Sequence, residues 1–114
     1  MGDEFILAVD QGTSATKAVI IDPLGRIVSK AASALQSYYP HAGFVEQDPE
    51  EIYRSVLDSV RSCLESFYQD GSRRLEDITC CGISNQRETF VLWDSNGQPL
   101  VNALVWQCKR SVDI

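Results

Sequence analysis

The fold is decided by residues 5–25, which read FILAVDQGTSATKAVIIDPLG. Residues 5–9 are wholly apolar, which is typical of a strand buried on both faces. Residues 10–14 then break the apolar run with polar residues and a glycine that favour a turn. Residues 17–21 are apolar again and end at the reverse-turn sequence DPLG. This stretch therefore predicts two strands joined by a tight polar hairpin.

The sequence after this hairpin predicts a third strand and then one main helix. Residues 26–35 can form the strand, so that three successive strands make an antiparallel meander. Irregular residues 37–47 follow. Asp48 can then cap a helix, with Pro49 in the first helical position and Glu51 placed to complete a capping box.

Apolar side chains recur at helical spacing after this start, so one face of the helix is expected to pack on the sheet. They are Ile52, Val56, Val60, Cys63, Leu64 and Phe67. Gly71 offers a left-handed stop for the helix. Residues 78–83 predict a second buried strand, residues 89–93 resume strand character after five polar residues, and residues 99–106 are again extended. We therefore expect an α/β fold with a mixed sheet, in the order β-β-β-α-β-β.

Composition narrows the class of protein. The 114 residues allow one small domain, and 44% apolar with 23% charged residues is a globular balance. The net charge of −6 argues against a nucleic-acid partner, and we expect the basic pair at residues 109–110 to lie on a solvated face. No apolar run reaches the length of a membrane span, and residues 1–5 do not resemble a signal peptide. We expect a cytoplasmic protein.

The chain has four cysteines, at positions 63, 80, 81 and 108. Cys80 and Cys81 are adjacent and would point to opposite faces of a strand, so they are poorly placed to bridge each other. No CxxC spacing occurs and His41 is the single histidine, which argues against a zinc site. We expect all four to be small core residues in a reducing compartment.

The polar hairpin is a candidate phosphate-binding site, although it lacks the P-loop pattern. Gly12 lets the backbone approach an anion, and successive N–H groups with the hydroxyls of Thr13 and Ser14 can donate hydrogen bonds. Asp10 could hold Mg²⁺ through water, and Lys17 could add positive charge. By composition alone, an ordinary hairpin with polar turn residues is the favoured interpretation.

A candidate polyol site follows the second buried strand, in residues 84–88. Arg87 supplies hydrogen-bond donors and Glu88 acceptors, a combination that suits vicinal hydroxyls. The indole of Trp106 can lie against the C–H side of a small polyol. Each feature also has a plain structural interpretation, as an Arg–Glu pair on a solvated turn and as a core tryptophan.

Taken in order, four strings resemble the FGGY family of carbohydrate kinases, in particular its glycerol kinases, within the actin-like ATPase superfamily. They are AVDQGTS at 8–14, GFVEQDPE at 43–50, GISNQRET at 82–89 and NALVWQ at 102–107. The resemblance covers essentially all of this chain but only the first quarter or so of a typical member. NQRET is its most specific part, since related xylulose kinases usually differ in that loop.

The resemblance implies an RNase H-like fold, with residues 1–114 as a single, incomplete N-terminal segment of the first kinase domain. It implies transfer of the γ-phosphoryl group of ATP to a terminal hydroxyl of glycerol, with Mg²⁺. The residues implied are Asp10 for the metal, Gly12, Thr13, Ser14 and Lys17 for the nucleotide phosphates, and Arg87, Glu88 and Trp106 for the polyol. The general base would be a downstream aspartate, so this segment needs the remainder of the kinase chain and is expected to be inactive alone. A homo-oligomer is compatible with the resemblance.

Two departures within the site, one outside it and two alternatives accompany this resemblance. Ala15 stands where relatives usually carry a hydroxyl residue, and Lys17 where arginine is usual, so we expect a phosphate hydrogen bond and a bidentate clamp to be weakened. Phe44 replaces a usual tryptophan outside the site. The protein could instead phosphorylate another sugar or polyol such as xylulose, or it could be a non-catalytic actin-like nucleotide-binding module. A polyol clamp of Arg87 and Glu88 argues against the second alternative.

Overall fold

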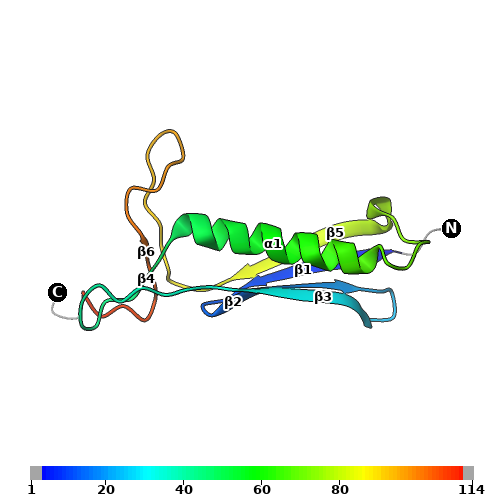
Figure 1. Cartoon of the computed structure of the whole chain (residues 1–114), viewed down its shortest axis with the longest axis horizontal. Helices are drawn as coiled ribbons and strands as arrows, with labels where there is room; N and C mark the ends of the chain where they lie inside the picture. The colour runs from blue at the N-terminus through cyan, green and yellow to red at the C-terminus, as the bar shows by residue number, and fades with distance from the viewer. Residues whose placement is uncertain (1–3, 112–114) are drawn as a thin grey trace.

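The structure, a computed structural model, describes residues 4–111 and shows one long helix lying along a sheet (Figure 1). The strands and helices in chain order are β1 (Phe5–Gln11), β2 (Ala15–Ile21), β3 (Ile27–Ala34), β4 (Glu46–Gln47), α1 (Pro49–Phe67), the 3-10 helix η1 (Leu75–Asp77), β5 (Ile78–Asn85) and β6 (Ala103–Leu104). The predicted α/β class, with a mixed sheet and one main helix, is confirmed.

The main sheet has the strand order β3-β2-β1-β5. Strands β1, β2 and β3 pair antiparallel, which confirms the predicted meander. Strand β5 pairs parallel to β1, with Gln11 opposite Asn85 in the register. Because parallel strands end at the same edge of a sheet, the segments that follow β1 and β5 start side by side. Strands β4 and β6 form a separate two-stranded sheet.

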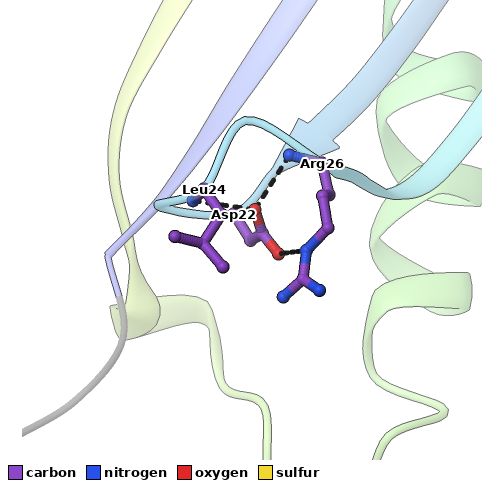
Figure 2. A network of polar contacts seen from close by, with 3 residues as sticks. All are labelled: Asp22, Leu24 and Arg26. Atoms are coloured by element: carbon purple, nitrogen blue, oxygen red, sulfur yellow. Dashed lines mark hydrogen bonds and ion pairs between the residues drawn. The ribbon is translucent and has the colours of Figure 1, made fainter.

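The turn between β2 and β3 is held by one carboxylate (Figure 2). Asp22 Oδ1 accepts hydrogen bonds from the backbone N–H groups of Leu24 and Arg26, and Oδ2 accepts from Arg26 Nε at 2.8 Å. Gly25 has a φ of +83°, a conformation that glycine adopts without steric cost. The backbone N–H of Arg26, followed by its side chain, lowers the pKa of Asp22. The predicted DPLG turn is therefore confirmed.

Helix α1 packs one face on the sheet as predicted, with Cys63 and Phe67 buried, but the centre of that face also contains two serines that were not predicted. The buried residues are Ser55, Ser59, Cys63 and Phe67. Val56, Val60 and Leu64 are only half-buried at the sides of this face. Small side chains at the centre of the face let the helix lie close to β2 and β3, and the larger flanking residues then fill the margins.

Two buried hydrogen bonds join this helix face to the sheet. The hydroxyls of Thr16 in β2 and Ser55 lie 2.7 Å apart, and Ser29 Oγ in β3 donates to the carbonyl of Cys63 at 2.6 Å. At the far end of the helix, Phe67 packs edge-on against Phe5 with ring centroids 5.0 Å apart. Close approach thus satisfies polar groups that burial would otherwise leave unpaired.

The two ends of α1 differ in part from the prediction. Asp48 caps the helix by accepting from the backbone N–H of Glu50, as expected. The Glu51 side chain, however, accepts from the Tyr38 hydroxyl instead of completing a capping box. The helix ends at Tyr68 in a right-handed conformation, so the predicted left-handed stop at Gly71 is wrong.

Strand β5 differs from the predicted buried strand because α1 packs mainly over β2 and β3. It is almost wholly exposed, with Ile83 at 69% exposure. The predicted strands at 89–93 and 99–106 shrink to isolated bridges and β6, since residues 86–111 extend past the end of the main sheet (Figure 1). The expectation of core cysteines holds only for Cys63, because Cys80 and Cys81 are exposed. Within residues 4–111, no helix is long and apolar enough to cross a membrane.

Replacing Ser59 with leucine tests the close approach of α1. Ser59 is 1% exposed, so Ser59→Leu should force the helix away from the sheet and lower the free energy of unfolding by about 1–3 kcal/mol. Urea unfolding followed by circular dichroism measures this change. Ser62→Leu, on the exposed side of the same helix, is the matched control and should leave stability almost unchanged. Equal effects of the two changes would contradict the close packing of α1 on the sheet.

Candidate functional site

An open cleft of about 380 Å³ lies at the carboxyl ends of β1 and β5. The hairpin after β1 forms one wall, the loop after β5 a second, and the segment around Trp106 a third. Its lining residues are Asp10, Gln11, Gly12, Thr13, Asn85, Gln86, Arg87, Glu88 and Trp106. The parallel β1–β5 pair thus places the first two walls side by side, and hydrogen bonds from Trp106 to Thr89 and Thr13 hold the third wall against them.

Six of the eight residues predicted for the site line this cleft, and two do not. Ser14 lies at the exposed tip of the hairpin. Lys17 lies on β2 opposite Asp10 in the register, and both residues line a neighbouring hollow on the sheet. Lys17 is therefore close to the predicted metal residue but outside the cleft that holds Arg87 and Glu88.

The hairpin favours glycine at position 12, because a side chain there would crowd the backbone. The backbone N–H of Gly12 donates to the carbonyl of Ala15 at 3.0 Å, and a Cβ at position 12 would lie 3.0 Å from that oxygen. This N–H already has a partner, so the predicted series of anion-binding N–H groups does not include it. Thr13 Oγ1 accepts from Trp106 Nε1 at 3.0 Å, which leaves the hydroxyl hydrogen of Thr13 available to donate.

Asp10 has the chemistry expected for a hydrated Mg²⁺. Its carboxylate is exposed, and Oδ1 accepts from Ser84 Oγ of β5 at 3.0 Å. Among residues 4–111, no group of three or more histidine, cysteine or acidic side chains could enclose a metal ion. An exposed carboxylate such as that of Asp10 fits a cation that keeps most of its waters.

The loop after β5 turns sharply at Glu88. The backbone N–H of Gln86 donates to the carbonyl of Gln11 at 2.8 Å and so extends the β1–β5 pairing by one residue. Glu88 then adopts a φ of +64°, in the left-handed region that costs a non-glycine residue about 1 kcal/mol. Strain of this kind persists where surrounding contacts hold it, and it is common in binding sites.

The wall around Trp106 is anchored at Arg110. The Arg110 guanidinium donates to Glu46 Oε2 and lies 4.1 Å from the centroid of the Phe44 ring. The prediction of a solvated face at residues 109–110 is therefore wrong for Arg110, because Glu46 and Phe44 together pair its charge and cover its plane. The hydrogen bond from Arg110, followed by one from Asn102, lowers the pKa of Glu46.

Sequence reasoning missed the amide side chains of the site. Gln11, Asn85 and Gln86 line the cleft, and Gln47 lies fully buried behind it. The available signal was position: Gln11 continues the inward-facing alternation of β1, and Gln86 directly follows the strand that ends at the same edge.

Comparison with known proteins identifies the family. Residues 5–114 match the FGGY family of carbohydrate kinases, N-terminal domain. The chain therefore belongs to the FGGY family of carbohydrate kinases.

Individual relatives agree with this assignment. The chain is 46% identical to glycerol kinase 1 of Thermotoga maritima over 96% of its length, and 49% identical to a glycerol kinase of Francisella philomiragia over 100%. It spans 22% of each of these proteins. The family resemblance of the sequence is confirmed.

Solved structures agree in fold. A xylulose kinase from Brucella ovis has a TM-score of 0.79 at 29% identity, over 94% of this chain and 22% of its own. A Plasmodium falciparum glycerol kinase with ADP has a TM-score of 0.73 at 34% identity, over 95% and 21%. These likenesses confirm the predicted fold class.

The Glu46–Arg110 pair should stabilise the protein in a pH-dependent way. The pKa of Glu46 lies below its ordinary value of 4.5, so the pair contributes fully above that pH and is lost as pH falls through the lowered pKa. Glu46→Gln should reduce stability well above pH 4.5, and its difference from the unsubstituted protein should shrink in more acidic solution. Urea unfolding over a pH series measures this difference. Glu65→Gln, at an exposed site on α1, is the control, and a pH-independent Glu46→Gln effect would contradict the assignment.

Proposed function

We propose that this chain is the N-terminal segment of an ATP-dependent glycerol kinase, which transfers the γ-phosphoryl group of ATP to a terminal hydroxyl of glycerol. The observation that carries the proposal is the meeting of Arg87 and Glu88 with Thr13 and Trp106 in one cleft. The identity of 46–49% to proteins named glycerol kinase supports the choice of substrate. In this proposal, residues 1–114 form part of the first kinase domain; residues 1–3 and 112–114 lie outside the described residues.

Arg87, Glu88 and Trp106 would bind the polyol. The Arg87 guanidinium donates and the Glu88 carboxylate accepts, so the pair can hold two neighbouring hydroxyls at once. The Trp106 side chain is half exposed and lines the same cleft, where its ring can cover the C–H side of a three-carbon chain.

The hairpin would bind the nucleotide phosphates. Thr13 and Ser14 would donate from their hydroxyls, Gly12 would allow close approach, and Lys17 would add positive charge beside Asp10. Asp10 would hold Mg²⁺ through water, and Mg²⁺ supplies neutralisation of phosphate charge when bound. A relative solved with ADP supports a nucleotide in this family.

The rest of the machinery would come from further protein. Phosphoryl transfer needs a base for the acceptor hydroxyl and a second wall around ATP, whereas this cleft is open on one side. The chain spans about a fifth of its curated relatives, so we propose that a longer kinase chain supplies both. Four free thiols among the described residues fit the reducing environment of the cytoplasm.

Xylulose is the second candidate substrate. The likeness to a Brucella ovis xylulose kinase, at a TM-score of 0.79, favours it. The higher sequence identity to glycerol kinases favours glycerol.

Substrate preference tests the proposal directly. The full-length kinase should release ADP faster with glycerol than with xylulose in a coupled assay with ATP and Mg²⁺. The isolated 114-residue chain should show only background turnover in the same assay, because it lacks the base and the second wall. Faster turnover on xylulose would overturn the choice of glycerol, and turnover by the isolated chain would overturn its proposed dependence on further protein.

Substitutions of Glu88 distinguish the role of its carboxylate in binding from the effect of its positive φ on stability. Glu88→Gly keeps a residue suited to positive φ, so the free energy of unfolding should stay within about 1 kcal/mol. Both Glu88→Gly and Glu88→Gln remove the charged acceptor. Each should therefore raise the KM for glycerol by about tenfold or more. Steady-state kinetics with varied glycerol measure this effect. Glu76→Gln, at an exposed site at the opposite end of β5, is the control; an unchanged KM in both Glu88 variants would exclude a polyol contact.

A further inference from the structure

The three walls of the cleft are joined by one closed circuit of hydrogen bonds, and we propose that this circuit sets the distance between the polyol and the phosphates. In this proposal, Gln47, Gln86 and Thr89 are positioning residues for Arg87 and Glu88. The inference rests on the function proposed above and assigns roles to residues outside the predicted site.

Gln86 is the centre of the circuit. Its Nε2 donates to Gln47 Oε1 at 3.0 Å and to Gln11 Oε1 at 3.2 Å. Its Oε1 accepts from Thr89 Oγ1 at 2.8 Å. Arg87 and Glu88 lie between Gln86 and Thr89. This last bond therefore joins the two ends of residues 86–89, which we call the polyol loop.

Gln47 carries the circuit to the phosphate hairpin. It is completely buried, and its Nε2 donates to the carbonyl of Thr13 at 2.7 Å and to Ser37 Oγ at 3.1 Å. A side chain from the segment just before α1 therefore holds the hairpin and, through Gln86, the polyol loop.

Trp106 completes the circuit from the third wall. Its backbone N–H donates to Thr89 Oγ1 at 3.2 Å, and its indole Nε1 donates to Thr13 Oγ1 at 3.0 Å. One path of hydrogen bonds thus runs from Trp106 through Thr89, Gln86 and Gln47 to Thr13. The indole bond from Trp106 to Thr13 joins the two ends of this path and closes the circuit.

The hydrogen bonds of the circuit fix the orientation of the Gln47 and Gln86 amide groups. Both amide nitrogens donate twice, and each amide oxygen accepts at least once. A reversed Gln86 amide would point its oxygen at the side-chain oxygens of Gln11 and Gln47. Among the described residues, no buried side-chain nitrogen or oxygen lacks a partner, so any reversal would leave groups unpaired.

A fixed circuit matters because phosphoryl transfer depends on position. The acceptor oxygen must approach the phosphorus in line, and a misplacement of about 1 Å can cost about 100-fold in rate. Arg87 and Glu88 project from an exposed loop that also contains the strained Glu88 backbone. Without the bonds at Gln86 and Thr89, few contacts would hold that loop at a set distance from Thr13.

The test uses the full-length kinase with Thr89→Val, Thr89→Ser and Gln86→Leu. Thr89 is half-buried, so its variants should still fold, and a thermal unfolding measurement checks this. Thr89→Val removes the hydroxyl and should lower kcat/KM for glycerol by about tenfold or more, with the KM for ATP unchanged. Thr89→Ser restores the hydroxyl and should stay within about threefold of the unsubstituted enzyme. Gln69→Leu, at an exposed glutamine beyond α1, is the control for Gln86→Leu.

Double substitution distinguishes a circuit from independent contacts. Gln86→Leu with Thr89→Val should be little worse than the more damaging single change, because either change already breaks the circuit. Multiplying effects, or wild-type kinetics in Thr89→Val, would overturn the circuit while leaving the proposed function intact. An unsubstituted enzyme that does not phosphorylate glycerol would instead overturn the proposed function, and the positioning role with it.

Discussion

The parallel pairing of β1 with β5 is the constraint on which the rest of the site depends. It joins segments more than 70 residues apart and sets Gln11 opposite Asn85 at the shared edge of the sheet. The backbone bond from Gln86 to Gln11 then carries the pairing into the loops. Because α1 packs mainly on β2 and β3, backbone hydrogen bonds to β1 provide most of the attachment of β5. The position of Arg87 and Glu88 relative to the hairpin follows from that one ladder.

The packing of helix α1 on one face of the sheet also helps to position the cleft. Its small buried side chains bring it close to β2 and β3, which fixes the segment that enters the helix at Asp48. Gln47 is the residue directly before that cap, so helix packing also places the amide that holds the hairpin. The packing of the core therefore positions the cleft through two adjacent residues, the helix cap Asp48 and Gln47.

Sequence reasoning succeeded where the signals were local. The hairpin at residues 10–14, the DPLG turn and the cap at Asp48 each depend on neighbouring residues, and all three are present in the structure. It failed where a residue's surroundings come from distant segments. The buried face of α1 includes Ser55 and Ser59 because Thr16 of β2 bonds to Ser55 and the helix lies close to β2 and β3. The partners of Gln47 and Gln86 likewise come from several segments, and no spacing in the sequence indicates them.

The open edge of β5 has a consequence for handling the chain by itself. In the described sheet, β5 has β1 on one side and no strand on the other, which leaves a row of backbone donors and acceptors along eight residues. The exposed thiols of Cys80 and Cys81 lie on the same strand. Two copies meeting at this edge could add strand to strand, and dissolved oxygen could then oxidise their thiols to a disulfide, so the purified 114-residue chain calls for a reducing agent and low concentration.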